Sequence, residues 1–188
     1  PALYSLMIYA DMALGTWYPQ GGMHKIIEGM YQLAEEMGVK IHLNQEVQRI
    51  YVPNGHATKV ITQDREYPAD VVIGGADYHH IEQKLLQPEH RRYSSAYWEK
   101  RTMAPSSLLF YLGVNKKLEG LQHHNLFFDE DFEQHAIEIY DEPQWPSKPL
   151  FYVCCNSKTD PSAAPAGMDN CFVLIPLAPD LEDTEAQR

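Results

Sequence analysis

The clearest hydrophobic pattern lies between residues 23 and 37, where apolar side chains recur every three or four positions. This spacing places them on one side of an α-helix, while charged and polar side chains occupy the other side. Gly38 follows where a residue in the left-handed conformation commonly ends a helix. The pattern predicts a helix over 23–37 whose apolar stripe packs against a core.

Shorter runs that alternate between apolar and polar residues follow this helix and predict strands. Pro53-Asn54-Gly55 interrupts them, and Asn-Gly is a strong signal for a tight hairpin turn. The run 70–73 is continuously apolar apart from its first residue, so we expect a buried strand there. The strands predicted in this part are 39–43, 47–52, 57–62, 66–67 and 70–73.

The second half of the chain mixes both patterns. Asp77 is suited to cap a helix through Leu86, and Pro88 stops it. Further helices are predicted over 93–101 and 131–140, and strands over 106–114, 125–128, 150–155 and 171–177. The fold class is therefore α+β, with a mixed β-sheet packed by helices. A change of composition near Asp77 suggests one domain over 1–77, holding the long helix and a small meander, and another over 78–188.

Composition narrows the possible partners. The formal net charge is −11, which argues against nucleic acid because phosphate binding depends on Lys and Arg. It also argues against general attraction to anionic lipid. No apolar run approaches the roughly 20 residues that span a bilayer. The three cysteines are expected to be reduced thiols, since their number and placement do not suit a disulfide framework.

Common catalytic motifs are absent from the sequence. It contains neither a Gly-x-Ser-x-Gly elbow nor a Gly-x-x-x-x-Gly-Lys-Ser/Thr loop. Nine histidines include the pair His123-His124, but adjacent side chains on a strand point to opposite faces. His79-His80, at a helix start, would diverge by about 100°. We therefore expect no metal site and read these histidines as structural or pocket residues.

Two glycine-containing segments remain as candidates for binding. Gly74-Gly75 follows the predicted strand 70–73, but the segment lacks the Gly-x-Gly-x-x-Gly pattern, and Asp77 would repel a pyrophosphate. Close approach of its backbone to another part of a cofactor is still possible. Trp17 and Tyr18 precede a Pro and two glycines, which suits either aromatic packing on the helix or the wall of a cavity for a large apolar ligand.

Several segments, in order and at compatible spacing, resemble the phytoene desaturase family of amine-oxidase-like flavoproteins. They are GTWYPQGGM (15–23), GVKIHLNQEV (38–47), ADVVI (69–73), GAD (75–77), HHNLFF (123–128), YVCCNSKTDPS (152–162) and FVLIP (172–176). The segments at 123–128 and 152–162 are the more specific ones. The resemblance covers nearly all of the chain.

The resemblance implies an FAD-dependent oxidoreductase that removes two hydrogens from a phytoene-like C40 polyene in carotenoid biosynthesis. Its substrate-side domain would be 78–188, and 1–77 would be the edge of its FAD domain. FAD contacts are expected at Val47, Gly75 and Ala76, and polyene contacts at Trp17, Tyr18, His124, Phe127 and Phe128, with His124 the polar one. No catalytic base stands out. A related carotenoid isomerase or oxidase, or a non-catalytic binding module, are the alternatives.

The resemblance also bears on cofactor retention and location. The family's two main flavin-binding segments, Gly-rich and near the two ends of the protein, are missing from this sequence. With its start at Pro1, the chain is thus expected to be an internal piece that is inactive alone and does not retain FAD. The full-length protein is expected in the cytoplasm, peripherally bound to a membrane that delivers its substrate, with a quinone or oxygen as electron acceptor.

Overall fold

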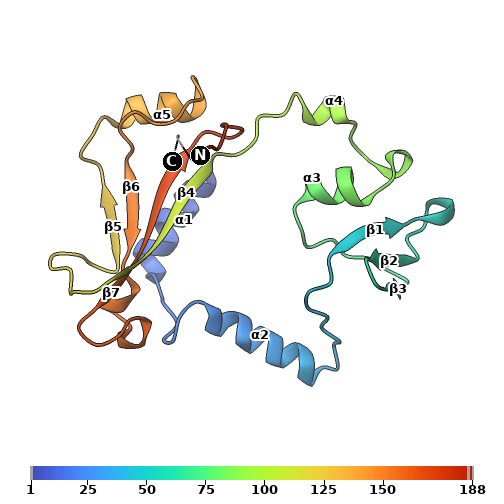
Figure 1. The fold of residues 1–188 in the computed structure, drawn as a ribbon, viewed down its shortest axis with the longest axis horizontal. Coiled ribbons are helices and arrows are strands. Elements are labelled where there is room, and N and C mark those ends of the chain that lie inside the picture. Colours follow the sequence, from blue (N-terminus) through green and yellow to red (C-terminus); the bar gives the residue numbers. More distant parts are fainter. Residues whose placement is uncertain (1, 186, 188) are drawn as a thin grey trace. The chain divides into compact units, whose positions relative to one another are not determined.

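The computed structural model describes residues 2–185 and 187, and the chain divides into two compact units (Figure 1). The first unit combines Pro1–Gly38 with Ala104–Arg188, and the second is Val39–Met103. The boundary suggested near Asp77 falls inside the second unit, and it stays a prediction about the domains of the whole protein. Helices and two antiparallel sheets confirm the α+β class, although neither sheet is mixed.

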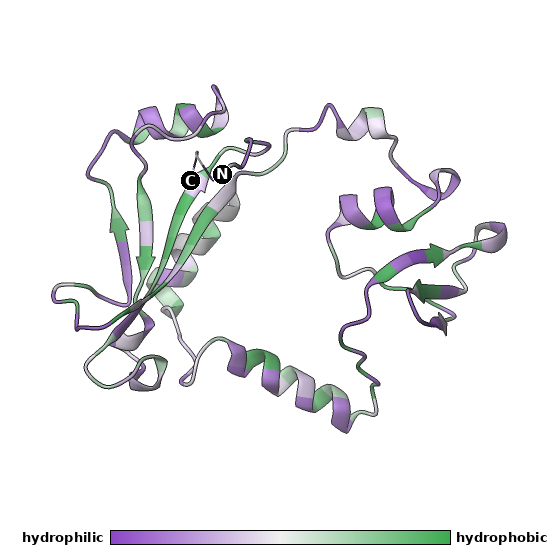
Figure 2. Ribbon diagram, viewed as in Figure 1, coloured by the Kyte–Doolittle hydropathy of each residue, from purple (hydrophilic) through white to green (hydrophobic). Residues whose placement is uncertain are grey.

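The first unit contains a four-stranded sheet in the order β4-β7-β6-β5. Its strands are β4 (Ser106–Val114), β5 (His124–Phe127), β6 (Phe151–Cys154) and β7 (Asp169–Leu177). All four lie where the sequence predicts strands. Hydrophobic residues dominate the two longest strands, the edge strand β4 and its neighbour β7 (Figure 2). Because the ladder between them runs without a bulge, side chains alternate regularly between the two faces of the sheet.

The two faces of this sheet are different. One face is packed, and its core consists of Val153, Cys155 and Cys171 with flanking apolar residues that include Phe127 and Phe151. The opposite face is open, and the strand register places two rows of side chains on it. One row is Tyr111, Phe172, Cys154 and His124, and the other is Leu109, Leu174, Tyr152 and Leu126.

Three helices belong to the same unit. They are α1 (Ala2–Leu14), which no sequence pattern had indicated, α2 (His24–Glu36) and α5 (Phe132–Tyr140). The prediction of α2 is confirmed, and Gly38 ends it with a φ of 82°. The expectation that its apolar stripe packs against a core is wrong for the described chain, since Met30 and Leu33 are 64% and 57% exposed.

The second unit is a meander followed by short helices. The sheet joins β1 (Val47–Tyr51), β2 (Lys59–Thr62) and β3 (Glu66–Pro68), and the turn η1 (Pro53–Gly55) connects the first two. Asn54 and Gly55 have the positive φ angles, 52° and 79°, that Asn-Gly indicated. The helical segments are α3 (Tyr78–His80), the π-helical η2 (Ile81–Leu85), η3 (Pro88–His90) and α4 (Ser95–Trp98). Asp77 caps α3 as predicted.

Two predicted strands of this unit are absent. Residues 39–43 and 70–73 have no strand structure. A strand needs a partner to satisfy its backbone groups, and no described strand pairs with either segment. The expected burial of 70–73 is also wrong, since Val71 and Ile73 are 75% and 90% exposed.

The buried carboxylate of Glu82 organises the helices of the second unit. The side chain is 2% exposed, and Oε1 accepts hydrogen bonds from the backbone N–H groups of Arg92 and Tyr93 at 2.6 and 3.0 Å. Trp98 Nε1 donates to Oε2 at 2.9 Å, and the Tyr78 hydroxyl lies 3.4 Å from Oε1. Burial works to raise the pKa of Glu82, but these hydrogen bonds outweigh it and hold the pKa below its usual value.

No helix in the described part of the chain is long and apolar enough to cross a membrane.

Candidate functional site

A cavity of about 800 Å³ in the first unit lies against the open face of the four-stranded sheet. Its sheet side includes Tyr111, Phe172, Cys154 and Tyr152. A loop before α2 adds Thr16, Trp17, Tyr18 and Met23, and the remaining lining residues are Leu112, Gly113, His123, His124, Asn156, Asn170 and Cys171. Trp17, Tyr18 and His124, three of the five predicted substrate residues, thus meet in one apolar cavity.

The loop that carries Trp17 and Tyr18 is fastened to the segment after β6. The backbone N–H of Gly21 donates to Oδ2 of Asp160 at 2.7 Å. Gly21 and Gly22 have φ angles of 88° and 101°, a conformation that residues with a side chain rarely adopt. The Ser162 hydroxyl and the Gly21 N–H hold the pKa of Asp160 below its usual value. With the loop anchored in this way, the ring centroids of Tyr18 and His123 lie 4.7 Å apart.

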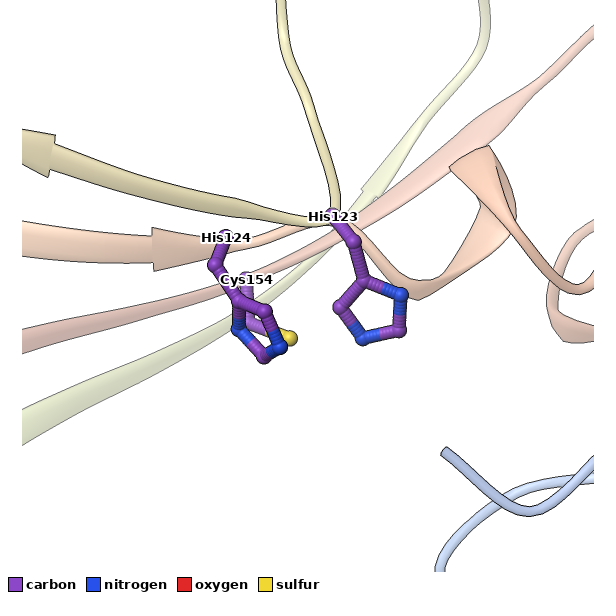
Figure 3. A group of neighbouring side chains, drawn as sticks. All are labelled: His123, His124 and Cys154. Atoms are coloured by element: carbon purple, nitrogen blue, oxygen red, sulfur yellow. The ribbon is translucent and has the colours of Figure 1, made fainter. Parts of the chain in front are cut away.

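Three residues that line this cavity, His123, His124 and Cys154, form a cluster. Figure 3 shows their side chains. The argument that the two imidazoles point to opposite faces is wrong, because His123 precedes β5 and is not bound by strand alternation. The ring centroids lie 4.4 Å apart. His124 Nδ1 is 2.6 Å from the Tyr152 hydroxyl, and His123 Nδ1 is hydrogen-bonded to the Thr159 hydroxyl.

The protonation states in the cluster favour neutral groups. Burial and then the neighbouring His124 lower the pKa of His123, so its imidazole is neutral near pH 7. Burial and then a hydrogen bond with Cys154 raise the pKa of Tyr152, so its phenol stays protonated. The polar part of the cavity is therefore uncharged at these positions, which suits an uncharged ligand that needs little desolvation of the wall.

The other two predicted substrate residues lie elsewhere. Phe127 alternates to the packed face, where its ring stacks on Phe151 at 4.6 Å between centroids. Phe128 lies beyond the end of β5 and lines a second cavity of about 220 Å³, together with Leu126, Phe132 and Tyr152. Tyr152 borders both cavities. The sequence argument could not separate Phe127 from Phe128, because it did not fix which face each side chain takes.

Asp169 holds the loops behind the cavity. Its carboxylate is 1% exposed and accepts hydrogen bonds from Leu118 N–H, Lys117 Nζ, Lys158 Nζ and Ser157 Oγ, all at 2.8 to 2.9 Å. The Leu118 N–H and the two ammonium groups keep the pKa of Asp169 far below its usual value. Sequence reasoning missed this residue, since an Asp at a strand start carries no signal of its partners.

Replacing Asp169 with Asn should lower the melting temperature at pH 7 by on the order of 10 °C, because it removes a buried charge that pairs with two lysines. A carboxylate whose pKa is depressed on folding stabilises the protein above its unfolded pKa of about 4, and loses this effect as the pH falls further. The difference in melting temperature between wild type and variant should thus narrow between pH 4 and pH 2. Thermal unfolding across this range measures it, and a constant difference would count against the charge.

The three cysteines are free thiols, as expected, and they differ in environment. Burial and then the neighbouring Cys155 raise the pKa of Cys171 to about 11. Cys154 is partly exposed and lines the cavity of about 800 Å³ on the open face of the sheet. Because the thiolate is the reactive form, iodoacetamide at pH 8 should label Cys154 well before Cys171. Peptide mass spectrometry over time gives the order, and equal rates would refute the difference.

The residues predicted to contact FAD meet in the second unit. Val47, Gly75 and Ala76 all line one cavity of about 350 Å³, together with Val72, Ile73 and Ile81 among others. Gly74 also lines it, and a Cβ atom at this position would lie 2.6 Å from Ile81 Cδ1. A side chain at Gly74 would therefore require the end of the Ile81 side chain to shift, whereas a Cβ atom at Gly75 would meet open space.

Comparison with known proteins agrees with the family resemblance seen in the sequence. The sequence model of the family described as flavin containing amine oxidoreductase matches residues 1–188. The chain belongs to this family.

Named relatives of the chain act on carotenoids. A carotenoid 3,4-desaturase from Haloarcula japonica is 42% identical over 100% of this chain and 38% of its own length. A zeta-carotene-forming phytoene desaturase from Myxococcus xanthus is 34% identical over 97% of this chain and 35% of its own length. The chain thus spans a little over a third of the length of these curated relatives.

A solved structure agrees on the fold. An oxidoreductase from Methanosarcina mazei matches with a TM-score of 0.61 at 23% identity, over 86% of this chain and 35% of that chain. At this identity the match supports the fold alone.

Membership of a flavin-containing family raises the question of whether the cavity at Val47 fits part of the cofactor. Its walls are mostly aliphatic, and the exposed backbone of Gly75 and Ala76 offers hydrogen-bonding groups at one side. Such a cavity fits a flat, partly apolar group such as a purine ring. The cavity therefore fits one edge of the flavin cofactor of this family. It does not fit the cofactor's pyrophosphate, because the sequence has no Gly-x-Gly-x-x-Gly turn to bind it.

Proposed function

We propose that this chain supplies the substrate-binding part of an FAD-dependent desaturase that removes two hydrogens from an acyclic carotenoid. The observation that carries the proposal is the pair of apolar cavities along one face of the four-stranded sheet, which share Tyr152. A C40 polyene is long, thin and uncharged, so it needs an extended apolar surface more than a compact pocket. The names of the relatives point to the same class of substrate.

The residues of the chain have separate roles in this proposal. Trp17, Tyr18 and Phe172 form aromatic walls that exclude water and orient the polyene. Leu126 and Phe128 extend the path into the second cavity. His124 and the Tyr152 hydroxyl form the polar contact beside the chain of double bonds. Bound FAD, held in part at Val47, Gly75 and Ala76, would take up the two hydrogens as a hydride and a proton and so be reduced to FADH₂, with a quinone or oxygen as the later electron acceptor.

Uptake of such a substrate from a lipid phase also belongs to the proposal. Trp17 and Leu126 are 87% and 66% exposed at the two cavities, so an apolar route into the sheet face is open in this unit. We therefore expect the full-length protein to contact membranes peripherally.

The direct test uses the full-length protein. Incubation with phytoene or another acyclic carotenoid, FAD and a quinone under anaerobic conditions should give a product whose absorption is shifted to the red, because each desaturation extends the conjugation. Omission of the quinone should limit the reaction to one turnover of the flavin. Absence of a red-shifted product with every acyclic carotenoid tested would refute the assignment as a desaturase, and an isomerised product would support the isomerase reading.

Cofactor retention gives a simple prediction for residues 1–188 alone. The cavity at Val47 has room for only part of FAD, so the separately purified chain should be colourless and release the cofactor on gel filtration. The full-length protein should keep its flavin spectrum through the same column. A yellow 188-residue preparation with one flavin per chain would contradict this division of the binding site.

A further inference from the structure

We propose that His123, His124 and Cys154 bind one transition-metal ion of intermediate softness, of which Zn²⁺ is the probe. One potential ligand atom from each of the three residues lies within 4.8 Å of the other two. Ligand atoms around a tetrahedral Zn²⁺ are about 3.3–3.8 Å apart, given bond lengths of about 2.0 Å to nitrogen and 2.3 Å to sulfur. Small side-chain rotations therefore close the site. Figure 3 shows both rings and the sulfur on the same side of the sheet.

The backbone fixes the three positions. His124 and Cys154 are direct partners across β5 and β6, so their side chains share the open face at neighbouring positions. The carbonyl of His123 accepts a hydrogen bond from Cys155 N–H at 2.7 Å, which ties the residue before β5 to the end of β6. A site whose ligands stand on paired strands needs little ordering when an ion binds.

The surrounding hydrogen bonds prepare the imidazoles for an ion. His124 Nδ1 pairs with the Tyr152 hydroxyl, and His123 Nδ1 pairs with the Thr159 hydroxyl. With Nδ1–H as the donor in each ring, Nε2 carries the free lone pair. Metal-binding histidines in proteins usually have such a partner on the other ring nitrogen, which fixes the tautomer and the ring orientation. Both imidazoles here have it before any ion is present.

The donor set selects the class of ion. Two imidazoles and a thiolate suit Zn²⁺, Co²⁺ or copper, whereas Mg²⁺ and Ca²⁺ require oxygen ligands. None of the described residues that line this cavity is a carboxylate. Three protein ligands leave a fourth position for water or a small ligand, as in zinc sites that are not purely structural. The three residues belong to the first unit, whereas the residues of the proposed flavin edge belong to the second.

The test measures Zn²⁺ binding to the full-length flavoprotein, with no carotenoid present, so that its outcome does not depend on desaturase activity. Titration calorimetry should give one strong Zn²⁺ per chain, and zinc X-ray absorption should show one sulfur at about 2.3 Å and nitrogen neighbours at about 2.0 Å. Cys154→Ala and His124→Gln should each weaken binding by at least about 100-fold. Flavin absorption and the melting temperature report whether each variant is folded.

Two matched substitutions serve as controls. Cys155→Ala removes the adjacent thiol, which is buried on the packed side, and His56→Gln removes an exposed imidazole of the η1 turn region. Both should leave Zn²⁺ affinity unchanged. His123→Gln, placed before the strand, provides a second ligand variant if Cys154→Ala does not fold. Absence of strong binding, a bound ion with only nitrogen and oxygen neighbours, or unchanged affinity in the folded ligand variants would overturn the proposal.

Discussion

Replacing Glu82 with Leu should destabilise the second unit by about 3–5 kcal/mol, because the change leaves buried donors without an acceptor. The carboxylate now accepts from two backbone N–H groups and from the Trp98 indole, and it is 2% exposed. A leucine of similar size fills the space and serves none of these donors. The effect should appear first as faster amide hydrogen exchange at Arg92 and Tyr93, and then as a lower urea midpoint.

Two other substitutions distinguish the effect of the negative charge of Glu82 from the effect of its buried position. Glu82→Gln keeps one carbonyl acceptor and should lose about half as much stability. Glu89→Leu, at an exposed site of the same unit, should change stability by no more than about 0.5 kcal/mol. Exchange rates at Arg92 and Tyr93 that match wild type in Glu82→Leu would show that the carboxylate does not hold this turn.

The sequence predicts local structure well where an element depends only on residues that are close to it along the chain. The helix α2, the turn at Asn54-Gly55 and the cap at Asp77 depend on neighbours a few residues away, and each forms where its pattern lies. The run 70–73 shows the limit of such prediction. An apolar run indicates a strand that needs neighbouring strands to pair with, but it does not show whether those strands are present in this chain. Ile73 accordingly stays 90% exposed.

The candidate site depends on longer-range facts that periodicity does not contain. The pairing of His124 with Cys154 follows from the register of β5 on β6, two strands that the connection 128–150 separates along the chain. The same register moves Phe127 to the packed face. The contact of Gly21 with Asp160 joins residues 139 positions apart. Trp17, Tyr18 and His124 could be named individually from the resemblance, but their meeting in one cavity comes from these pairings.

Replacing Leu126 with Asp should lower kcat/KM for an acyclic carotenoid by at least about 100-fold in the full-length protein. Leu126 lies beside Tyr152 on the open face and lines the second cavity, so an aspartate would place a charge against the proposed path of the polyene. Desolvating an unpaired carboxylate costs several kcal/mol, and each 1.36 kcal/mol in the barrier is a factor of ten. Folding should be little affected in this unit, because Leu126 is 66% exposed there.

Leu126→Met provides the matched control, since it keeps the volume and apolar character of the side chain and should change kcat/KM by less than about threefold. Flavin content and melting temperature should agree among wild type and both variants, which confines the comparison to the substrate. The loss in Leu126→Asp should also shrink as the pH falls toward the pKa of an ordinary aspartate, about 4, because protonation removes the charge. Wild-type turnover in a folded, flavin-loaded Leu126→Asp protein would place the polyene elsewhere. A loss that the neutral methionine variant shares, or a loss in Leu126→Asp that does not change with pH, would instead assign the effect to side-chain shape and not to charge.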